Sequence, residues 1–254
     1  MKIVTYQFIA LLLLLFSGIA KSNEINAVTE VFYPYQIMGA DNKLTGYSID
    51  VVDELFKITG DKLNLSVLPW SVAYKKASTT PDLMIFSIGK NKDREHLFDW
   101  TAKIATEKLY FWTLPESQIT PSTKLSDFKD MRIAVVKDAT THEYLSKLDF
   151  SNLYIMGATT SNSDEVHRIR MLLNGRADIV IAVERGIYTA LKDLGMDKNR
   201  LKKVFRANML DSDLHIAFNN ESNPALTQKY RSAMEILAHT GKLTTLKKKW
   251  RISE

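Results

Sequence analysis

Apolar side chains recur along this sequence with two alternating periods, that of a β-strand and that of an α-helix. Residues 63–67 alternate apolar and polar positions, which predicts a half-buried strand, and residues 51–58 place apolar side chains on one face of a helix. Short apolar runs typical of buried parallel strands recur at residues 83–88, 132–136, 153–156 and 178–183. Strands that alternate with helices in this way predict an α/β protein.

A change in composition at residues 115–127 divides the pattern into two parts. Pro115, Pro121 and several Ser and Thr residues interrupt the apolar periodicity there, as expected of a linker or hinge. Further on, residues 140–143 (TTHE) form a capping box that opens a helix directly after a predicted strand. The residues alone therefore predict two α/β units joined near residues 112–125.

The N-terminal residues have the features of an export signal. Lys2 supplies a positive charge, residues 8–16 (FIALLLLLF) form an apolar run, and a small-residue cleavage site ends at Ala20. Cleavage after Ser22 fits the same rule. The apolar run is shorter than the roughly 18 residues that usually span a bilayer, so we expect residues 1–22 to be a cleaved signal peptide. This predicts a protein of the periplasm of a Gram-negative bacterium.

Composition argues against several functional classes. The 254-residue chain has no cysteine and 5 histidines, which disfavours a thiol enzyme, a zinc enzyme, a disulfide-stapled domain and a lipoprotein anchor. Its formal charge of +5 is mild, and the basic cluster at residues 247–251 is interpreted as the solvated face of a C-terminal helix. We therefore expect no metal, no cofactor and no nucleic-acid partner.

Several short motifs follow one another over most of the chain. In the first half they are residues 32–35 (FYPY), 46–51 (GYSIDV), 87–94 (SIGKNKDR) and 98–101 (FDWT). In the second half they are residues 134–141 (AVVKDATT), 174–178 (NGRAD) and the segment 237–250, which contains Gly241 and ends at Trp250. Each motif is weak alone, but in this order they resemble the family 3 extracellular solute-binding proteins, the polar amino acid receptors of ABC importers.

The resemblance implies a two-lobed periplasmic-binding-protein fold of type II. Each lobe would be a mostly parallel sheet flanked by helices, and a two-stranded hinge would join the lobes. The chain would cross between the lobes twice, so that residues 23–113 and 214–254 form the first lobe and residues 114–213 the second.

The resemblance also implies a ligand site between the lobes, centred on Arg94. A guanidinium offers two parallel donors to one carboxylate, and Arg94 stands where the family places that group. Without the family context, a surface arginine paired with Asp93 or Glu95 would be the usual explanation. Further polar and backbone contacts would come from the end of a predicted parallel strand, at Ser87, Gly89 and Asn91.

Other predicted contacts come from a helix start and from aromatic side chains. Thr140 and Thr141 lie at a predicted helix N-terminus, where free backbone N–H groups favour an anionic group, although N-capping would also explain them. Phe32, Tyr33 and Trp70 are candidates for aromatic walls that sandwich the ligand, whereas burial in a core is the usual role of such residues.

One position departs from the family pattern. The family holds the ligand ammonium with an aspartate just after the strand that follows its Gly-Arg-x-Asp motif, and this chain has Val183 there. Glu184 is the neighbouring candidate, but successive side chains on a strand point to opposite faces. If Glu184 takes no part, an organic acid becomes as plausible a ligand as an amino acid.

These observations predict a monomeric binding protein that closes two lobes around an amino acid or another small carboxylate and presents it to the permease of an ABC transporter. Two alternatives remain open: a ligand-sensing partner of a membrane receptor, and a lyase of the same superfamily. A lyase would need a general acid or base in the cleft, for which His142, Glu143 and Glu184 are the nearest candidates. Since the sequence shows no paired nucleophile and base, we expect no enzymatic activity.

Overall fold

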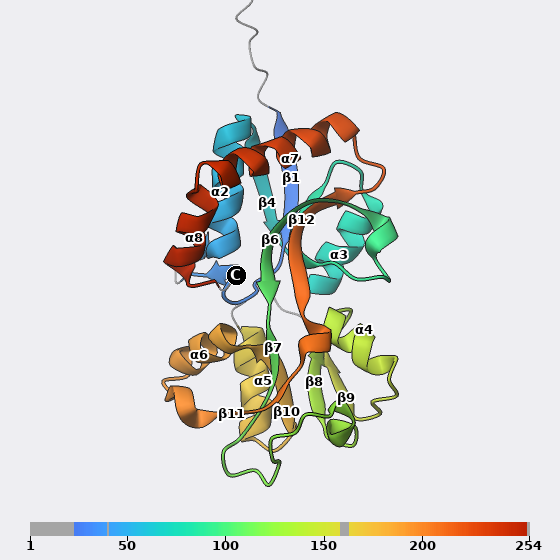
Figure 1. The fold of residues 1–254 in the computed structure, drawn as a ribbon, viewed down its shortest axis with the longest axis vertical. Coiled ribbons are helices and arrows are strands. Elements are labelled where there is room, and N and C mark those ends of the chain that lie inside the picture. Colours follow the sequence, from blue (N-terminus) through green and yellow to red (C-terminus); the bar gives the residue numbers. More distant parts are fainter. Residues whose placement is uncertain (1–22, 40, 158–162, 253–254) are drawn as a thin grey trace, which may run out of the picture.

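The computed structural model describes residues 23–39, 41–157 and 163–252, which form two lobes placed one above the other in Figure 1. The predicted signal peptide, residues 1–22, lies outside the described residues. Within the described part of the chain, no helix combines the length and the apolar character needed to span a bilayer. Each lobe has a five-stranded sheet flanked by helices, so the α/β prediction is confirmed.

The first lobe is built on strands from both ends of the chain. They are β1 (Glu24–Thr29), β4 (Lys62–Val67), β5 (Met84–Gly89), β6 (Phe98–Glu107) and β12 (Ser212–Asn219). In the order β4-β1-β5-β12-β6, β1 is parallel to β4 and β5, whereas β12 is antiparallel to β5 and β6. The sheet is flanked by α2 (Tyr47–Thr59), α3 (Trp70–Thr79), α7 (Pro224–His239) and α8 (Lys242–Trp250). Smaller elements are β2 (Ile37–Met38), β3 (Leu44–Thr45) and the 3₁₀-helix η1 (Glu95–Leu97).

The second lobe comes from the middle of the chain. Its strands are β7 (Leu109–Thr113), β8 (Ile133–Val136), β9 (Leu153–Met156), β10 (Ile179–Val183) and β11 (Lys202–Arg206). In the order β11-β7-β10-β8-β9, β8 is parallel to β9 and β10, and β7 is antiparallel to β10 and β11. Its helices are α4 (Thr140–Ser146), α5 (Ser163–Leu173), α6 (Glu184–Asp193) and the 3₁₀-helices η2 (Leu125–Phe128), η3 (Lys198–Arg200) and η4 (Asn208–Leu210).

Two segments of the chain, which lie side by side, cross between the lobes. β6 continues through Lys108 into β7, and η4 leads from β11 into β12, with the Ala207 N–H donating to the Leu109 carbonyl at 2.9 Å. The first crossing therefore precedes the predicted boundary at 113/114, because β7 pairs with β10 and β11 in the second sheet. Sequence reasoning missed it because apolar strand residues continue across Lys108 without a turn signal. The segment 115–127, interpreted as a hinge, belongs to the second lobe beyond β7.

Each lobe has its own hydrophobic core. In the first lobe, α2 buries Val51, Val52 and Leu55, the stripe that the apolar spacing predicted, and each such side chain contributes about 1.5–3 kcal/mol. The C-terminal helices α7 and α8 pack on α2, and the Trp250 indole N–H donates to Asp50 Oδ2 at 2.5 Å. The C-terminal segment thus returns to the first lobe, as the resemblance implied.

Candidate ligand-binding site

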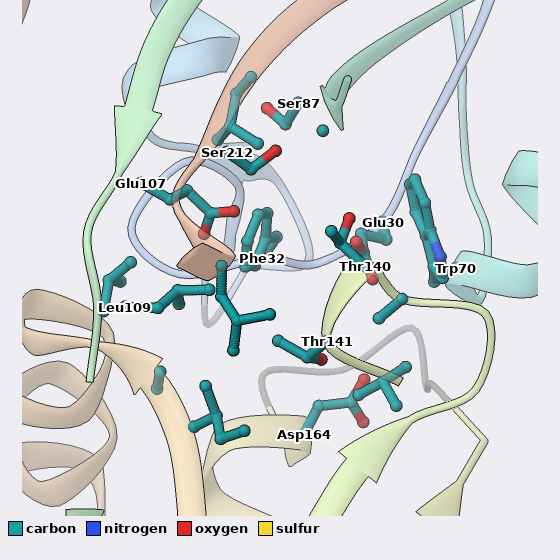
Figure 2. A pocket seen from close by; sticks show the side chains of 18 of the residues that line it. Glu30, Phe32, Trp70, Ser87, Glu107, Leu109, Thr140, Thr141, Asp164 and Ser212 are labelled. Carbon is teal, nitrogen blue, oxygen red and sulfur yellow. The ribbon is translucent and has the colours of Figure 1, made fainter. Parts of the chain in front are cut away.

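A cavity of about 100 Å³ lies between the two lobes (Figure 2). Its walls form where β1, β5, β6, β8 and β10 end and where β12, α4 and α5 begin. Ligands bind at this edge of open α/β sheets, beyond the strand ends. Seven of the residues predicted from the sequence line the cavity: Phe32, Trp70, Ser87, Gly89, Arg94, Thr140 and Thr141.

Arg94 is fully buried, and two nitrogen atoms of its guanidinium have no hydrogen-bond acceptor within the described part of the chain. The guanidinium carbon lies 4.7 Å from the ring centroid of Tyr74 and 5.6 Å from that of Trp70. Its Nη2 donates to Glu143 Oε1 at 2.6 Å and to the Asp138 carbonyl at 3.2 Å. Among the described residues, buried Nε and Nη1 of Arg94 have no hydrogen-bond partner. Because unpaired buried donors are costly, this geometry suits a ligand acceptor such as a carboxylate.

The alternative explanation of Arg94 as a surface residue does not hold. Asp93 is paired with Lys147 of the second lobe, and Glu95 is paired with Lys90 at 2.8 Å. Neither acid next to Arg94 in the sequence therefore neutralises it.

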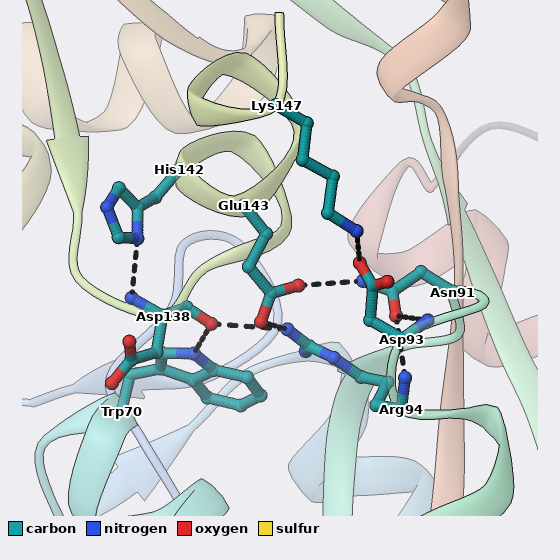
Figure 3. Close-up of polar contacts among 8 residues, drawn as sticks. All are labelled: Trp70, Asn91, Asp93, Arg94, Asp138, His142, Glu143 and Lys147. Atoms are coloured by element: carbon teal, nitrogen blue, oxygen red, sulfur yellow. Dashed lines mark hydrogen bonds and ion pairs between the residues drawn. The ribbon is translucent and has the colours of Figure 1, made fainter.

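The groups around Arg94 also connect the two lobes (Figure 3). The Trp70 indole N–H donates to the Asp138 carbonyl at 2.8 Å, and the Asn91 side chain donates to Glu143 Oε2 at 2.9 Å. Glu143 on α4 of the second lobe thus holds both Arg94 and Asn91 of the first. Asn91 lies at this contact between the lobes and is not among the residues that line the cavity, so its expected role as a ligand contact stays a prediction.

Helix α4 forms where it was predicted, but Glu143 does not complete a capping box. The helix begins at Thr140, and its N-cap residue, Ala139, makes no side-chain capping bond. Glu143 is directed to the first lobe instead, where Arg94 donates to its Oε1 and Asn91 to its Oε2. Thr140 and Thr141 therefore stand at a helix start with their side chains at the cavity wall (Figure 2).

The end of β5 brings the backbone close to both lobes. Ser87 has φ of 59°, a conformation uncommon for a residue with a side chain, and its hydroxyl donates to Ser48 Oγ at 2.8 Å. A Cβ on Gly89 would lie 2.4 Å from Ser212 Oγ and 3.2 Å from Thr140 Oγ1. The close approach of Ser212 and Thr140 therefore explains why glycine occupies this position.

The predicted aromatic residues divide into two groups. Phe32 and Trp70 line the cavity, as expected for walls around a ligand. Tyr33 does not line it: its hydroxyl donates to Asp193 Oδ2 at 2.9 Å, and Asp193 belongs to α6 of the second lobe. Tyr33 is therefore a second point of contact between the lobes and not a cavity wall.

Val183 and Glu184 face different surroundings. Val183, at the end of β10, lines the cavity with an apolar side chain. Glu184 begins α6 outside it, accepts a hydrogen bond from the Tyr188 hydroxyl at 2.6 Å and pairs with Lys203 at 2.8 Å. The structure thus places Glu184 outside the cavity where a ligand contact was expected, because the chain turns into a helix at this point and directs the carboxylate to Tyr188 and Lys203.

Sequence reasoning missed a group of acids at the cavity. Glu30 follows β1, Glu107 ends β6, and Asp164 and Glu165 lie in the first turn of α5. We refer to these four residues as the acidic wall. Arg168 lies among them and donates from Nη2 to Glu165 Oε1 at 2.7 Å. Within the described residues, no three potential metal ligands are grouped so that they could hold an ion.

Burial and mutual repulsion alter the ionisation of the acidic wall. Burial, followed by the charge of Glu165, raises the pKa of Glu107 to about 8, although Arg168 lowers it. Burial, followed by Glu165 and Asp164, also raises the pKa of Glu30 well above its usual value. The Glu107 side chain is 7% exposed, and within the described residues its buried Oε1 has no hydrogen-bond partner.

A signal for part of the acidic wall was present in the sequence. Glu30 and Glu107 adjoin strand ends, so the reasoning that selected Ser87 would also have selected them. Asp164 and Glu165 instead resemble the acids common in the first turn of a helix. Only the fold brings that helix start to the same cavity.

Known proteins resemble this chain over most of its length. The model of the bacterial extracellular solute-binding proteins, family 3, matches residues 25–253. The L-cystine-binding protein TcyA of Bacillus subtilis (strain 168) is 24% identical over 241 residues, which cover 93% of this chain and 84% of that protein.

Solved structures share the two-lobed architecture. A histidine kinase sensor domain with similarity to periplasmic binding proteins has a TM-score of 0.79 and 18% identity, covering 91% of this chain and 96% of that chain. The arginine-, lysine-, histidine-binding protein ArtJ of Geobacillus stearothermophilus has a TM-score of 0.75 and 20% identity, covering 90% and 95%. These likenesses show the fold, and the family model matches nearly the whole sequence. The chain therefore belongs to the bacterial extracellular solute-binding proteins, family 3.

Proposed function

We propose that this chain is a monomeric periplasmic receptor, exported by its signal peptide, that binds an amino acid between its lobes and presents it to an ABC importer. The names of two similar proteins, an L-cystine-binding protein and an arginine-, lysine-, histidine-binding protein, support an amino acid as the ligand class. The proposed activity is binding without catalysis, in keeping with a family of binding proteins.

The observation that carries the proposal is the state of the Arg94 guanidinium. It is fully buried at the cavity, and Nε and Nη1 have no acceptor among the described residues. A ligand carboxylate would satisfy a charged donor of this kind, and a hydrogen bond to a charged group is worth about 1.5–3 kcal/mol.

The contacts around Arg94 provide a means of closure. The guanidinium comes from the first lobe, while Glu143 and the Asp138 carbonyl come from the second. A ligand bound to Arg94 gains contacts at Thr140 and Thr141 only when the lobes meet. Binding would therefore favour the closed arrangement, which the importer would recognise.

The test is a ligand screen on the mature chain after denaturation and refolding to remove bound ligand. At 100 times its dissociation constant, an amino acid should stabilise the fold by about 2.7 kcal/mol, measured as a rise in melting temperature. Arg94→Gln should weaken binding about 100-fold in titration calorimetry, the loss of a buried charged contact.

Arg200→Gln is the matched control, since Arg200 pairs with Glu116 on the surface of the second lobe, at 2.8 Å. Binding should be unchanged in this variant. Equal affinity in the wild-type and Arg94→Gln proteins, or no binding of any amino acid, would contradict the proposal.

A further inference from the structure

The acidic wall contains a buried acceptor that the protein leaves unused. Glu107 is 7% exposed and lines the cavity, and its Oε1 has no hydrogen-bond partner among the described residues. Figure 2 shows the Glu107 carboxyl group extending from the β6 side, across the cavity from Trp70. A buried acceptor without a partner is costly, so a donor on the ligand would be favoured at this point.

Acidic groups outnumber basic groups in the cavity lining. Four carboxyl groups and two guanidinium groups line it. Arg94 is already paired with Glu143, and Arg168 is paired with Glu165. Arg168 therefore acts on Glu165, Glu30 and Glu107 together, so the carboxyl groups at this end of the lining outnumber the guanidinium groups.

The electrostatic neighbours show that Arg94 and the acidic wall form separate environments. The cation that lowers the pKa of Glu30 and of Glu107 is Arg168. Arg94 instead lowers the pKa of Tyr74, which burial raises. A ligand with its carboxylate at Arg94 would thus present its other polar groups to a region in which carboxyl groups outnumber guanidinium groups.

The valine at position 183, where the family resemblance implies an ammonium acceptor, also indicates that a ligand cation would need another acceptor. Val183 occupies that position and offers no polar atom, while Glu184 is held outside the cavity by Tyr188 and Lys203. Any cationic group of the ligand must find its acceptor elsewhere on the lining. Glu30 and Glu107 are two carboxyl groups there that form no ion pair within the described residues.

We propose that Glu30 and Glu107 bind cationic nitrogen atoms of the ligand, so that the preferred ligand is an amino acid with a positively charged side chain. This inference rests on the proposed function, in which Arg94 binds the ligand carboxylate. Two such carboxyl groups match the α-ammonium and the side-chain cation of a basic amino acid. A dicarboxylic ligand would add negative charge to the acidic wall and is disfavoured.

The test compares ligands of matched shape that differ in side-chain charge. L-Arginine and L-citrulline form one pair, and L-lysine and L-norleucine form another. Titration calorimetry should show that the charged member of at least one pair binds about tenfold more tightly or better, as expected for a charge-assisted hydrogen bond. Of Glu107→Gln and Glu30→Gln, the variant that removes the acceptor of the side-chain cation should reduce that preference about tenfold. The other variant, which removes the acceptor of the α-ammonium, should weaken the binding of both members of a pair alike.

Glu235→Gln is the control, because Glu235 is an exposed acid on α7 of the first lobe. The melting temperature of each ligand-free variant reports whether it folds. Equal affinities within both pairs, or a charge preference untouched by both cavity variants, would overturn this inference while the proposed function stands. Failure of every amino acid to bind would overturn the proposed function and this inference with it.

Discussion

The Arg94 end of the cavity and the acidic wall balance their charges in different ways. At Arg94, opposite charges come from the two lobes, with Glu143 2.6 Å from the guanidinium and Lys147 paired with Asp93 nearby. At the acidic wall, one guanidinium, Arg168, is surrounded by four carboxyl groups. The first region can hold the lobes together by protein contacts alone, whereas the second requires a proton or an external cation to reach neutrality.

The largest expected effect concerns the acidic wall without ligand. Burial raises the pKa of Glu107 from its usual value of 4.5 to about 8, so the folded state binds a proton that the unfolded state releases. Stability should therefore fall as the pH rises from about 4.5 and should level off above about 8, with a total loss of about 2–4 kcal/mol from this group. Denaturant unfolding of the wild-type and Glu107→Gln proteins across this range measures it, and Glu107→Gln should flatten the fall.

Other charged groups near Glu107 also affect this pH dependence, so a second variant tests their share. Besides burial, Glu165 and Asp211 raise the pKa of Glu107 and Arg168 lowers it, while Glu107 in turn raises the pKa of Glu30. Glu30→Gln should remove a further part of the pH dependence, because the pKa of Glu30 is also raised. Identical pH profiles for the wild-type and Glu107→Gln proteins would show that Glu107 is ionised in the folded state.

A smaller effect is expected from breaking the ion pair between Arg94 and Glu143, at the other end of the cavity. Glu143→Ala leaves the fully buried Arg94 with the Asp138 carbonyl as its acceptor and also frees Asn91. The ligand-free protein should lose about 2 kcal/mol, less than for a fully buried pair because Glu143 is partly exposed. Thermal unfolding measures the loss, and a bound amino acid should recover part of it by supplying a carboxylate to Arg94. A variant as stable as wild type would mean that this ion pair does not stabilise closure.

The smallest effect tests the close approach at the end of β5. Gly89→Ala would place a Cβ 2.4 Å from Ser212 Oγ, which requires the Ser212 side chain to move. We expect a loss of about 1 kcal/mol in stability, typical of added atoms in a packed site, together with weaker ligand binding. The double variant Gly89→Ala/Ser212→Gly should recover most of the lost stability and most of the lost ligand affinity. If the double variant is no better than Gly89→Ala, the contact with Thr140 at 3.2 Å is the cause instead.

Sequence reasoning selected residues at the Arg94 end of the cavity and missed the acidic wall. Arg94, Ser87 and Gly89 lie within one short segment whose order of residues is distinctive, so their proximity follows from the chain itself. Asn91 belongs to the same segment, but its side chain donates to Glu143 of the second lobe and does not line the cavity.

The turn signals in the sequence also failed to locate the boundary between the lobes. A run of strand residues passes through Lys108 without interruption, and pairing with β10 and β11 assigns β7 to the second sheet. Proline and serine residues after β7 gave a stronger turn signal at a place where no crossing occurs. Local breaks in periodicity mark turns, but they do not show which sheet a strand joins.

The sequence by itself determined the alternation of strands and helices, and its motif order, through the family resemblance, implied the return of the C-terminal segment and selected Arg94 as a candidate ligand contact. These features depend on local periodicity and on motif order, which the chain carries directly. Only the tertiary structure decided that Glu30, Glu107 and Asp164 share one cavity and that Glu184 lies outside it. The physical reason is that these acids come from segments far apart in the chain, and two crossings between the lobes bring them together.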